Sequence, residues 1–444
     1  MSGYAERRGQ LLAAFGERGH GSVGIAKDTS NLFRDRAPAG KHLLDVRSFD
    51  HVLAVDPAAQ WVEAEGMTPY EEIVARTLAA GVMPAVVPQL KTITLGGAAA
   101  GVGIEASSFR HGLVHESLLE MDVLTGDGRI VTCTPDNEHR DLFFGFPNSY
   151  GTLGYALRLR MRTIPVKGFV ELRHRRFGDP RAFFAALAET CAQPVDFVDG
   201  VVFGPGDLVL TTGRFAEAAP YTSDYTFENI FYRSLREREV DYLSTQDFLW
   251  RRDTDWFWCS KNVGAQVPWI RRIYGRERLG SRTYQKIMRW NSRWGFARAL
   301  ARLRGLRTES VIQDVDIPID RAPEFLEFFQ RDIRIAPVWI CPIRASAQAG
   351  RFCLYPLRPG ALYVNFGFWD VVRTSAEHSP GFFNRLVEHE VEALGGIKSL
   401  YSDSYYSRES FWRNYGGAGY CALKARYDPQ GMFPGLYEKC VLRH

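Results

Sequence analysis

Residues 94–112, TLGGAAAGVGIEASSFRHG, contain five glycines and little charge. Within them, Gly101-Val-Gly103-Ile-Glu-Ala106 fits G-x-G-x-x-A, a pattern known from dinucleotide-binding loops. Glycines let the backbone approach a ligand closely and adopt positive φ, and successive amides form an anion-binding nest. This stretch therefore has the residues to bind a phosphate group through backbone N–H groups. The alternative at this point is a turn packed by small residues.

The surroundings of the glycines disfavour a Rossmann loop. Such a loop follows a buried strand, opens a helix and is followed about 20 residues later by an acid. Here the next residues, SSFRHGLVHES, show no clean helical period, and the next regular element has the pattern of a hairpin. A phosphate-binding loop of another kind remains open.

The sequence lacks the patterns of metal sites, nucleophile triads and disulfide frameworks. His111 and His115 are four residues apart but do not form H-E-x-x-H, and nothing resembles a Ser-His-Asp nucleophile. The seven cysteines include no C-x-x-C, which indicates reduced cytosolic thiols rather than a zinc site or a disulfide framework. We therefore expect no metal.

The elements around the glycine stretch have readable patterns. Residues 42–66 alternate short β-rich runs with turns and predict strands. Residues 68–81 carry apolar side chains at helical spacing and predict a helix that ends at Gly81. Residues 119–134 predict a hairpin with its turn at 126–128. Residues 149–165 predict a glycine turn followed by a strand, because Leu157, Leu159 and Met161 alternate with Arg158, Arg160 and Arg162.

The rest of the chain changes in composition near residue 170. Residues 170–215 mix strands with one helix, residues 220–310 are aromatic and basic, and residues 311–400 alternate strands and helices again. The tail, YDPQGMFPGLYEKC, has the composition of a loop.

The totals limit the class of protein. The 444 residues suffice for two domains, and 45% apolar with 24% charged residues is ordinary for a globular protein. The net charge of +4 is too small to indicate nucleic acid as a partner. The N-terminus lacks the apolar core of a signal peptide, and no apolar run reaches about 20 residues, so we expect no transmembrane segment.

Residues 87–165 resemble the FAD-binding domain of the vanillyl-alcohol-oxidase-type flavoproteins. The similar features are Gly96-Gly97, the glycine-rich loop, the motif V-x-x-x-x-G before a strand, DLF, and a G-x-x-G turn. The sterol side-chain (24-position) reductases and their bacterial relatives, which act on methyl- or methylene-branched fatty acyl chains, resemble the chain over nearly its whole length. The stretches CTPDNEHRDLFFGFPNSYGTLGY, PVWICPIR, LYSDSYYSRESFW and FPGLYEKC carry that resemblance.

The resemblance implies an α+β fold, with a two-subdomain FAD-binding domain of the PCMH and vanillyl-alcohol-oxidase type and an α+β cap. We expect the FAD-binding domain in residues 1–170, the cap or substrate domain in 171–400, and a C-terminal segment, 401–444, that returns to the flavin. The implied FAD contacts are Lys27, Thr29, Ser30, Asn31, Gln89, Leu90, Thr94, Gly96, Gly97, Gly101, Gly103, Ile104, Ser107, Ser108, Gly112 and Tyr155.

Two features need comment: the first phosphate loop differs from the usual family pattern, and family members differ in how they attach FAD. Residues 24–36 occupy the position of the family's first phosphate loop but are not glycine-rich, and a turn capped by Ser30 or Asn31 is the alternative. Some relatives attach FAD covalently through His or Cys. The branch that this chain resembles does not, so we expect non-covalent FAD, with His111 in a packing or hydrogen-bonding role.

A carbon–carbon redox reaction at a flavin also needs a proton donor or acceptor. Residues 400–412 supply candidates, and in strand geometry Tyr401, Asp403 and Tyr405 would share one face. The alternative is an aromatic wall with a satisfied Asp–Arg pair. The expected catalytic residues are Tyr401, Asp403, Tyr405, Arg408 and, flanking the flavin loop, Glu105.

Residues 269–307 carry twelve Lys or Arg and one acid, a local charge of +11 (12 − 1). Ile287, Trp290, Trp294, Ala297 and Ala301 follow helical spacing, beside a stripe of Arg282, Lys286, Arg289 and Arg293. A basic amphipathic helix with tryptophans suits an anionic membrane surface. The alternatives are a solvated face on a core-packed helix and a binding surface for an acidic protein, such as a methyltransferase acting on the same lipid.

The sequence therefore predicts an FAD-dependent oxidoreductase that reduces or introduces a carbon–carbon double bond in a lipid, with NADPH as the donor if it reduces. We expect a methyl- or methylene-branched acyl chain of a phospholipid at the inner face of a membrane, with the protein itself in the cytoplasm. The alternatives are a sterol side-chain reductase, an oxidase of small alcohols or sugars, and a membrane-lipid-binding protein without chemistry.

Overall fold

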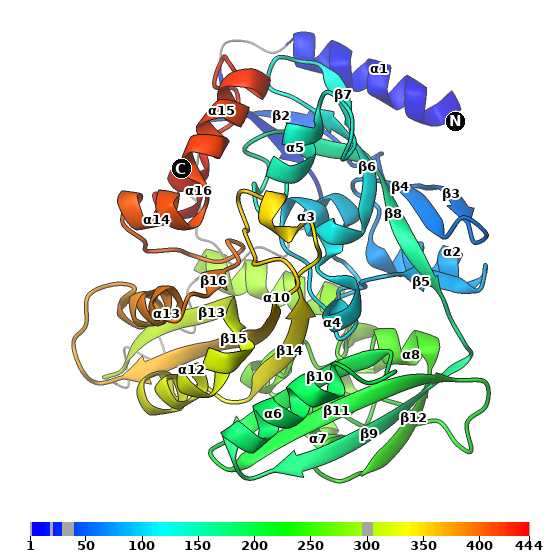
Figure 1. Cartoon of the computed structure of the whole chain (residues 1–444), viewed down its shortest axis with the longest axis vertical. Helices are drawn as coiled ribbons and strands as arrows, with labels where there is room; N and C mark the ends of the chain where they lie inside the picture. Colours follow the sequence, from blue (N-terminus) through cyan, green and yellow to red (C-terminus); the bar gives the residue numbers. More distant parts are fainter. Residues whose placement is uncertain (1, 18–20, 29–39, 295–304, 444) are drawn as a thin grey trace.

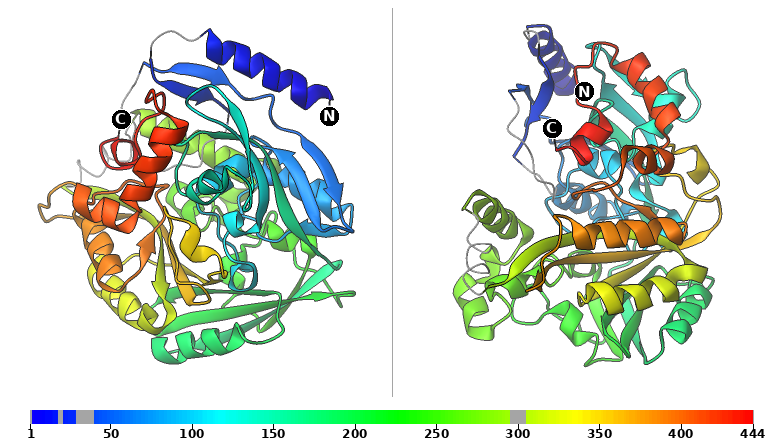
Figure 2. Two further views of the ribbon diagram at one scale, coloured as in Figure 1. Left: turned by 45° about the horizontal axis from the view of Figure 1, so that its top comes forward. Right: turned by 90° about the vertical axis from the view of Figure 1, so that its left-hand side faces the viewer.

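The computed structural model describes residues 2–17, 21–28, 40–294 and 305–443. Among them, one six-stranded and one eight-stranded sheet organise the chain, together with a separate parallel pair, β1 (Val23–Ala26) and β2 (His42–Asp45). Figures 1 and 2 show the six-stranded sheet in the half of the molecule that carries the N-terminal helix, and the eight-stranded sheet in the other half. Helices and sheets are mixed along the chain, so the expected α+β class is confirmed.

The six-stranded sheet comes from the first 165 residues and is antiparallel throughout. Leu157, Leu159 and Met161 are buried as predicted, while Arg158 and Arg160 make ion pairs on the other face. No parallel strand pair occurs in this sheet, so a Rossmann arrangement is excluded. Its strands are β3 (Val52–Asp56), β4 (Trp61–Glu65), β8 (Tyr155–Pro165), β6 (Leu118–Leu124) and β7 (Ile130–Cys133) in that order, with β5 (Val82–Pro84) paired to β8.

The helices of this part are short except at the N-terminus. The predicted helix in 68–81 is α2 (Tyr70–Leu78), and Gly81 follows with a φ of 74°. Residues 107–117, for which the sequence predicted no helix, contain two single turns, α4 (Ser108–His111) and η1 (Val114–Ser117). The others are α1 (Ser2–Gly16), α3 (Leu95–Ala100) and α5 (Arg140–Gly145).

The eight-stranded sheet is also antiparallel throughout. Helices α6 (Pro180–Thr190), α12 (Ala322–Phe328) and α13 (Phe382–Ala393) pack on one of its faces around a second hydrophobic core. Along β13 the odd-numbered residues, such as Gln313, face these helices, because Gln313 bonds to Asn384 of α13. The even-numbered residues Asp314 and Asp316 therefore face the other way. The strand order is β12 (Val240–Ser244), β9 (Phe169–Phe177), β11 (Asp207–Ala216), β10 (Phe197–Gly204), β14 (Val338–Arg344), β15 (Leu362–Thr374), β13 (Arg307–Pro318) and β16 (Ile397–Lys398).

The aromatic and basic segment forms short helices between β11 and β13. The predicted amphipathic helix is α10 (Ser281–Trp294), and Ile287 packs against a small core that contains Trp256 and Tyr284. Its predicted continuation through Ala297 and Ala301 lies outside the described residues, as do the side chains of Arg289, Trp290, Arg293 and Trp294. The other elements here are α7 (Phe231–Ser234), α8 (Thr245–Leu249), η2 (Cys259–Val263), α9 (Pro268–Tyr274) and η3 (Arg276–Arg278).

The C-terminal segment packs against the first half of the chain. The amide of Gly126 donates to the Tyr427 carbonyl, and Lys424 Nζ donates to the Thr152 carbonyl. The tail expected as a loop ends in a helix, because Leu436, Tyr437 and Cys440 of α16 bury into the core. The domain boundaries expected at residues 170 and 400 stay predictions. The remaining elements are α14 (Arg408–Asn414), α15 (Gly417–Tyr427), α16 (Leu436–Cys440), η4 (Ile319–Arg321), η5 (Phe329–Ile333) and η6 (Ala349–Arg351).

A buried ion pair holds the start of this C-terminal segment. Lys398 Nζ lies 2.7 Å from Glu388 Oε1 and donates to the Asp403 carbonyl at 2.6 Å. The amide of Tyr405 donates to the Glu388 carboxylate at 3.0 Å. The pair therefore joins α13 to residues 403–405.

We expect Lys398→Met to lower the free energy of unfolding by about 3–5 kcal/mol, because it leaves a buried carboxylate without its cation. Arg413→Met is the matched control. It removes the half-exposed pair with Glu392 and is expected to cost no more than about 1 kcal/mol. Thermal and chemical unfolding of both variants measures the difference. Equal midpoints would contradict a supporting role for Lys398.

Candidate functional site

Residues from both sheets and from the C-terminal segment line a cavity of about 740 Å³, within the size range of ligand pockets. Its lining includes glycines and lysines as well as a set of aromatic side chains. The glycines that line it are Gly24, Gly96, Gly97, Gly101, Gly103, Gly151 and Gly154.

Two glycines bring α3 against the six-stranded sheet. The amide of Gly96 donates to the Gly66 carbonyl at 2.8 Å, and a Cβ at Gly96 would lie 2.7 Å from that oxygen. At Gly66, a Cβ would lie 2.0 Å from the Ala156 carbonyl of β8. No other residue type fits either position without moving backbone. Both glycines therefore serve packing, and Gly96 has already used its amide.

The backbone just after α3 supplies donors instead. Among the described residues, the amides of Val102, Gly103 and Ile104 have no protein acceptor, and all three residues line the cavity. Gly101 still donates to the Gly97 carbonyl at the end of the helix. Three successive amides without acceptors form the kind of nest that binds phosphate oxygens.

Basic side chains accompany this nest. Lys27, Lys41, Lys439 and Arg443 all line the cavity. Lys439 Nζ donates to the Tyr150 carbonyl at 2.5 Å, so its position is fixed at the wall. Cations beside backbone donors match the two negative charges of a dinucleotide diphosphate.

The buried amide of Gln89 also suits the flavin cofactor. Gln89 is 3% exposed and lines the cavity, yet neither its Oε1 nor its Nε2 has a partner among the described residues. Buried amide groups are rarely left unsatisfied, so such a group indicates a ligand. A flavin ring offers both hydrogen-bond donors and acceptors. The amide nest, the cations and Gln89 together fit FAD.

Part of the cavity lining is aromatic. Trp256, Phe257, Tyr284, Trp339 and Trp369 line it. The ring centroids of Phe257 and Trp369 are 4.7 Å apart, and those of Phe257 and Trp339 are 5.4 Å apart. These contacts make an apolar wall suited to a hydrocarbon.

Three successive residues in or next to this wall have unfavourable backbone conformations. Trp256, Phe257 and Trp258 have φ values of 53°, 49° and 56°, in the left-handed region that costs about 1–2 kcal/mol per residue. Such strain persists where the surroundings impose it and often marks a functional site. Trp258 is fully buried, which fixes the turn from behind.

A buried charge cluster lies behind the wall. Arg251 Nη2 lies 3.0 Å from Glu105 Oε1 and 3.2 Å from Asp199 Oδ2. Asp199 also pairs with Arg252 at 3.2 Å and accepts a hydrogen bond from Trp339 Nε1. Burial acts in the opposite direction, but Arg251 and Arg252 lower the pKa of Asp199. The cluster thus orients Trp339 through an ionised carboxylate.

An acid and a tyrosine lie beside the aromatic wall. Asp314 of β13 and Tyr401 both line the cavity and are hydrogen-bonded to each other, and Trp369 Nε1 donates to Tyr401 Oη at 2.8 Å. Burial raises the pKa of Asp314 to about 7. Burial, and then the nearby Asp314, raise the pKa of Tyr401 well above its usual value. Near neutral pH this carboxyl group exists in both protonation states, as a proton donor requires.

Room for the Asp314 carboxyl comes from the neighbouring strand. Gly367 of β15 pairs with Asp314, and a Cβ there would lie 2.7 Å from Asp314 Oδ1 and 2.6 Å from the Trp369 ring. Glycine inside a strand often marks such a close approach. Gly367 therefore lets the acid and the indole lie side by side.

The structure separates the expected FAD contacts into three sets. Thr29, Ser30 and Asn31 lie outside the described residues. Ser107, Ser108 and Gly112 do not line the cavity: Ser107 Oγ donates to the Ala85 carbonyl and Ser108 Oγ accepts from the Glu105 amide. The ten that line it are Lys27, Gln89, Leu90, Thr94, Gly96, Gly97, Gly101, Gly103, Ile104 and Tyr155. His111 does not line it either.

Of the expected catalytic residues, only Tyr401 lines the cavity. Residues 401–407 form no strand, so the shared face inferred for Tyr401, Asp403 and Tyr405 does not exist. Arg443 links the latter two to the cavity: its Nη2 donates to Tyr405 Oη at 2.9 Å, and its Nε lies 3.7 Å from Asp403 Oδ1. Arg408 is exposed and lies 3.7 Å from Glu438, while Glu105 points into the charge cluster.

Most of the aromatic wall and the acid Asp314 were not predicted from the sequence. Asp314 carried one signal, since two acids alternate with apolar residues in DVDIP at the end of the strand, and a glycine interrupts the facing strand. The run WFWC at 256–259 was a second signal, because four such residues in succession are seldom all solvent-exposed. The lysines at positions 41 and 439 had no local signal.

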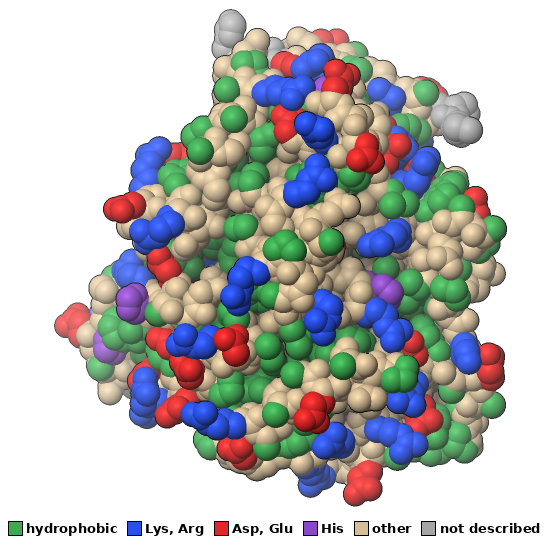
Figure 3. All heavy atoms as spheres, viewed as in Figure 1, with side chains coloured by type: hydrophobic (Ala, Val, Ile, Leu, Met, Phe, Trp, Pro, Cys, Tyr) green, Lys and Arg blue, Asp and Glu red, His purple; other side chains and the backbone are tan. Residues whose placement is uncertain are grey.

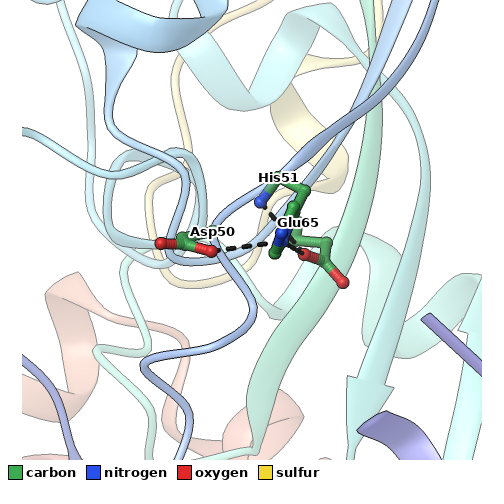
Figure 4. A group of neighbouring side chains, drawn as sticks. All are labelled: Asp50, His51 and Glu65. Atoms are coloured by element: carbon green, nitrogen blue, oxygen red, sulfur yellow. Dashed lines mark hydrogen bonds and ion pairs between the residues drawn. The ribbon is translucent and has the colours of Figure 1, made fainter. Parts of the chain in front are cut away.

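A group of metal-ligating types lies elsewhere among the described residues, at Asp50, His51 and Glu65 (Figure 4). Glu65 already accepts from Arg7, 2.5 Å away, and from the His51 amide and Nδ1. The arrangement works as an ion-pair cluster that ties α1 to β4. No described helix has the length and apolar character needed to cross a bilayer.

Comparison with known proteins agrees with this site. Residues 11–134 match the family model described as FAD binding domain. Residues in the amide nest, Gln89, Lys27 and Lys41 all lie inside that range. The FAD-binding domain expected from the sequence is thereby confirmed for these residues, and the resemblance to FAD-binding oxidoreductases is supported by the relatives that follow.

Within that family, the chain is similar to Delta(24)-sterol reductases. It is 29% identical to the Homo sapiens protein over 401 residues, which span 87% of this chain and 75% of the relative. It is 25% identical to the Pisum sativum protein over 440 residues, spanning 89% and 76%. A stretch of 126 residues is 33% identical to cytokinin dehydrogenase 7 of Oryza sativa subsp. japonica, covering 28% of this chain and 24% of that protein.

We expect Gln89→Leu to weaken FAD binding about fivefold to tenfold, the effect of losing one hydrogen bond in a dry site. Folding should be unaffected, because the amide has no partner among the described residues. Gln285→Leu is the matched control, since that amide donates to Thr92 Oγ1 and does not line the cavity. Flavin fluorescence titrations of the apoproteins give both dissociation constants. Equal losses in the two variants would contradict a flavin contact at Gln89.

Proposed function

We propose that this protein is an FAD-dependent oxidoreductase that reduces or introduces a carbon–carbon double bond in a lipid, namely a methyl- or methylene-branched acyl chain of a phospholipid. The observation that carries the proposal is a single cavity lined by the amide nest, by lysines and by an aromatic wall with a buried acid. The similarity to Delta(24)-sterol reductases supports the reaction class.

The chain's own residues divide the work. Val102, Gly103 and Ile104, with Lys27 and Lys41, would hold the diphosphate, and Gln89 would hold the ring. When bound, FAD supplies or accepts the hydride, and NADPH is the proposed donor in the reducing direction. The aromatic wall excludes water and holds the hydrocarbon beside the ring.

Tyr401 is the proposed proton donor, and Asp314 then returns a proton to the tyrosine oxygen. The Tyr401 oxygen accepts from Trp369 Nε1. The hydrogen bond between Tyr401 and Asp314 lowers the pKa of the acid, because the tyrosine hydroxyl donates to the ionised carboxylate. When Asp314 is protonated, that acceptor is weakened, and the hydroxyl can donate into the cavity that Tyr401 lines. In reduction, one carbon gains the hydride, the other gains the Tyr401 proton, and the Asp314 proton returns to the tyrosine oxygen. Desaturation runs these transfers in reverse.

The substrate is the finer part of the proposal. A branched acyl chain and a sterol side chain both present a branched, unactivated alkyl segment, which the aromatic wall would accept. An oxidase of small alcohols would need several polar groups to bind its substrate. Beside the aromatic wall we find Asp314, Tyr401 and the Tyr284 hydroxyl, and the tryptophans and Phe257 present mostly apolar surface. That composition favours a lipid.

We expect lipids of a host that expresses this protein together with a candidate methyltransferase to show methylated acyl chains shifted by about two mass units. The direction of the shift distinguishes reduction from desaturation. A Tyr401→Phe variant that still binds FAD is the control and should abolish the shift. A change confined to sterols would assign the sterol alternative. Unchanged lipids, with peroxide released from small alcohols, would contradict the proposal.

We expect Asp314→Asn to slow the carbon–carbon step by about 10²–10⁴-fold, the usual contribution of general acid catalysis. In the reducing direction, the wild-type rate should fall as the pH rises through about 7, because the carboxyl group must carry its proton. In the desaturating direction, the rate should rise over the same range. The pH dependence should be absent from the variant.

Asp316→Asn provides the control, because Asp316 lies two residues along the same face of β13 but does not line the cavity. Its carboxyl accepts from Tyr355 and Asn365. That variant should lose stability and keep a pH dependence, with its midpoint moved to lower pH because the charge of Asp316 no longer raises the pKa of Asp314. Identical pH profiles in wild type and Asp314→Asn would rule out Asp314 as the titrating group.

A further inference from the structure

Asp253 is a buried acid that accepts hydrogen bonds from two backbone amides distant from each other in the chain. It is 2% exposed. Its Oδ1 accepts from the Lys91 amide at 3.0 Å, and its Oδ2 accepts from the Ser281 amide at 3.2 Å. A Cβ at Gly280 would lie 3.1 Å from Oδ2, so the glycine leaves room for the carboxylate. One carboxylate thus joins the segment before α3 to the first residue of α10.

The acid and its two donors are each close in sequence to the cavity lining. Gln89 lies two residues before the first donor, Trp256 lies three residues after the acid, and Tyr284 lies three residues after the second donor. All three of these side chains line the cavity. Asp253 therefore lies where the segment proposed to hold the flavin ring meets two parts of the aromatic wall.

The segment that carries Gln89 is fixed through its backbone. We call residues 88–94 the flavin-side segment, because five of them line the cavity. The amide of Glu71 in α2 donates to the Lys91 carbonyl at 3.2 Å. Lys91 is therefore bonded to α2 through its carbonyl and to Asp253 through its amide.

On the side of the wall, Asp253 adjoins a tightly packed group. Trp256 Nε1 donates to the Leu279 carbonyl at 2.6 Å. The rings of Trp256 and Tyr284 are stacked, with their centroids 5.0 Å apart and their planes at 27°. A shift of Asp253 relative to Lys91 would therefore move this part of the wall relative to the flavin-side segment.

Two further contacts cross the same junction, but both join side chains. Gln285 Nε2 donates to Thr92 Oγ1 at 2.8 Å, and Arg282 pairs with Glu71 at the surface. Basic and acidic side chains neighbour each other over much of the face in Figure 3, and exposed pairs of this kind contribute little. The hydrogen bonds to Asp253 constrain the backbone itself and are buried.

We propose that Asp253 is a positioning residue that sets the separation between the flavin-side segment and the aromatic wall. The inference rests on the proposed function, because this separation determines how closely a hydrocarbon against the wall approaches the flavin ring beside Gln89. A misplacement of about 1 Å can slow a reaction about 10²-fold. A carboxylate has two acceptor oxygens, whereas the side-chain amide of asparagine has one. Asp253→Asn therefore keeps the shape of the side chain and removes one of the two bonds.

The experiment compares FAD-loaded Asp253→Asn with FAD-loaded Asp241→Asn as a matched control. Asp241 is fully buried and does not line the cavity. It accepts from Ser223 Oγ at 2.5 Å and from the Tyr242 amide at 2.9 Å. Both variants should lose stability, because each removes an acceptor from a buried hydrogen-bonded group.

Flavin fluorescence measures the separation without the substrate. Tryptophan and tyrosine quench an excited flavin by electron transfer, and this quenching falls steeply with distance. We expect a longer fluorescence lifetime in Asp253→Asn and an unchanged lifetime in Asp241→Asn. The FAD dissociation constant should stay close to that of wild type in both variants, because the amide nest and the lysines remain. The carbon–carbon step should slow about tenfold to 100-fold in Asp253→Asn alone.

Gly280→Ala is a milder variant that keeps the acid. Its Cβ would press on Asp253 Oδ2, so the fluorescence lifetime should change in the same direction by a smaller amount. Flavin uptake with equal lifetimes in wild type, Asp253→Asn and Gly280→Ala would overturn the positioning role alone. Equal changes in Asp253→Asn and Asp241→Asn would also overturn it, because they would show a general loss of stability. A wild-type protein that takes up no flavin would instead overturn the proposed function.

Discussion

The hydrogen bond between the Gly96 amide and the Gly66 carbonyl determines where the rest of the site lies. It holds α3 against β8 at a distance that only glycine permits on both sides. The chain leaves α3 at Gly101, and the three amides that follow, in residues that line the cavity, have no acceptor among the described residues. A β-carbon at Gly66 or Gly96 would push α3 away and scatter those donors. The glycines therefore act mainly by shaping the backbone, and the phosphate donors are their neighbours.

A second close approach, at Gly367, positions the acid and the tyrosine that are proposed to transfer the proton. Gly367 leaves space in β15 for the Asp314 carboxyl and the Trp369 indole, and Trp369 then bonds to Tyr401. A larger residue would displace one of these groups and separate the acid from the tyrosine. Burial raises the pKa of Asp314 only because the carboxyl is enclosed here without a cation among its described partners. Asp199, equally buried but beside two arginines, has its pKa lowered instead.

Local patterns predicted much of the fold but only half of the site. The alternation in β8, the helical spacing in α2 and the turn at 126–128 come from neighbouring residues, and each was predicted correctly. The cavity combines residues far apart in sequence, such as Lys41, Asp314 and Lys439, and no local pattern encodes such a meeting. The strand geometry assumed for Tyr401, Asp403 and Tyr405 was wrong, because the Glu388–Lys398 pair holds residues 403–405 as a loop. Tertiary contacts decide conformation there.

Unfavourable backbone conformations and buried charges occur around the aromatic wall of the cavity. Three left-handed aromatic residues and two buried arginines surround the wall, where a simple hydrophobic core would be more stable. A simple core would also collapse into the space that a hydrocarbon must enter. The Arg251–Asp199–Trp339 chain and the turn at 256–258 are each anchored from behind, so the wall keeps its shape without a ligand against it. These buried charges thus maintain an apolar cavity beside an acid. Reduction of an unactivated alkene needs the cavity to hold the hydrocarbon and the acid to supply a proton.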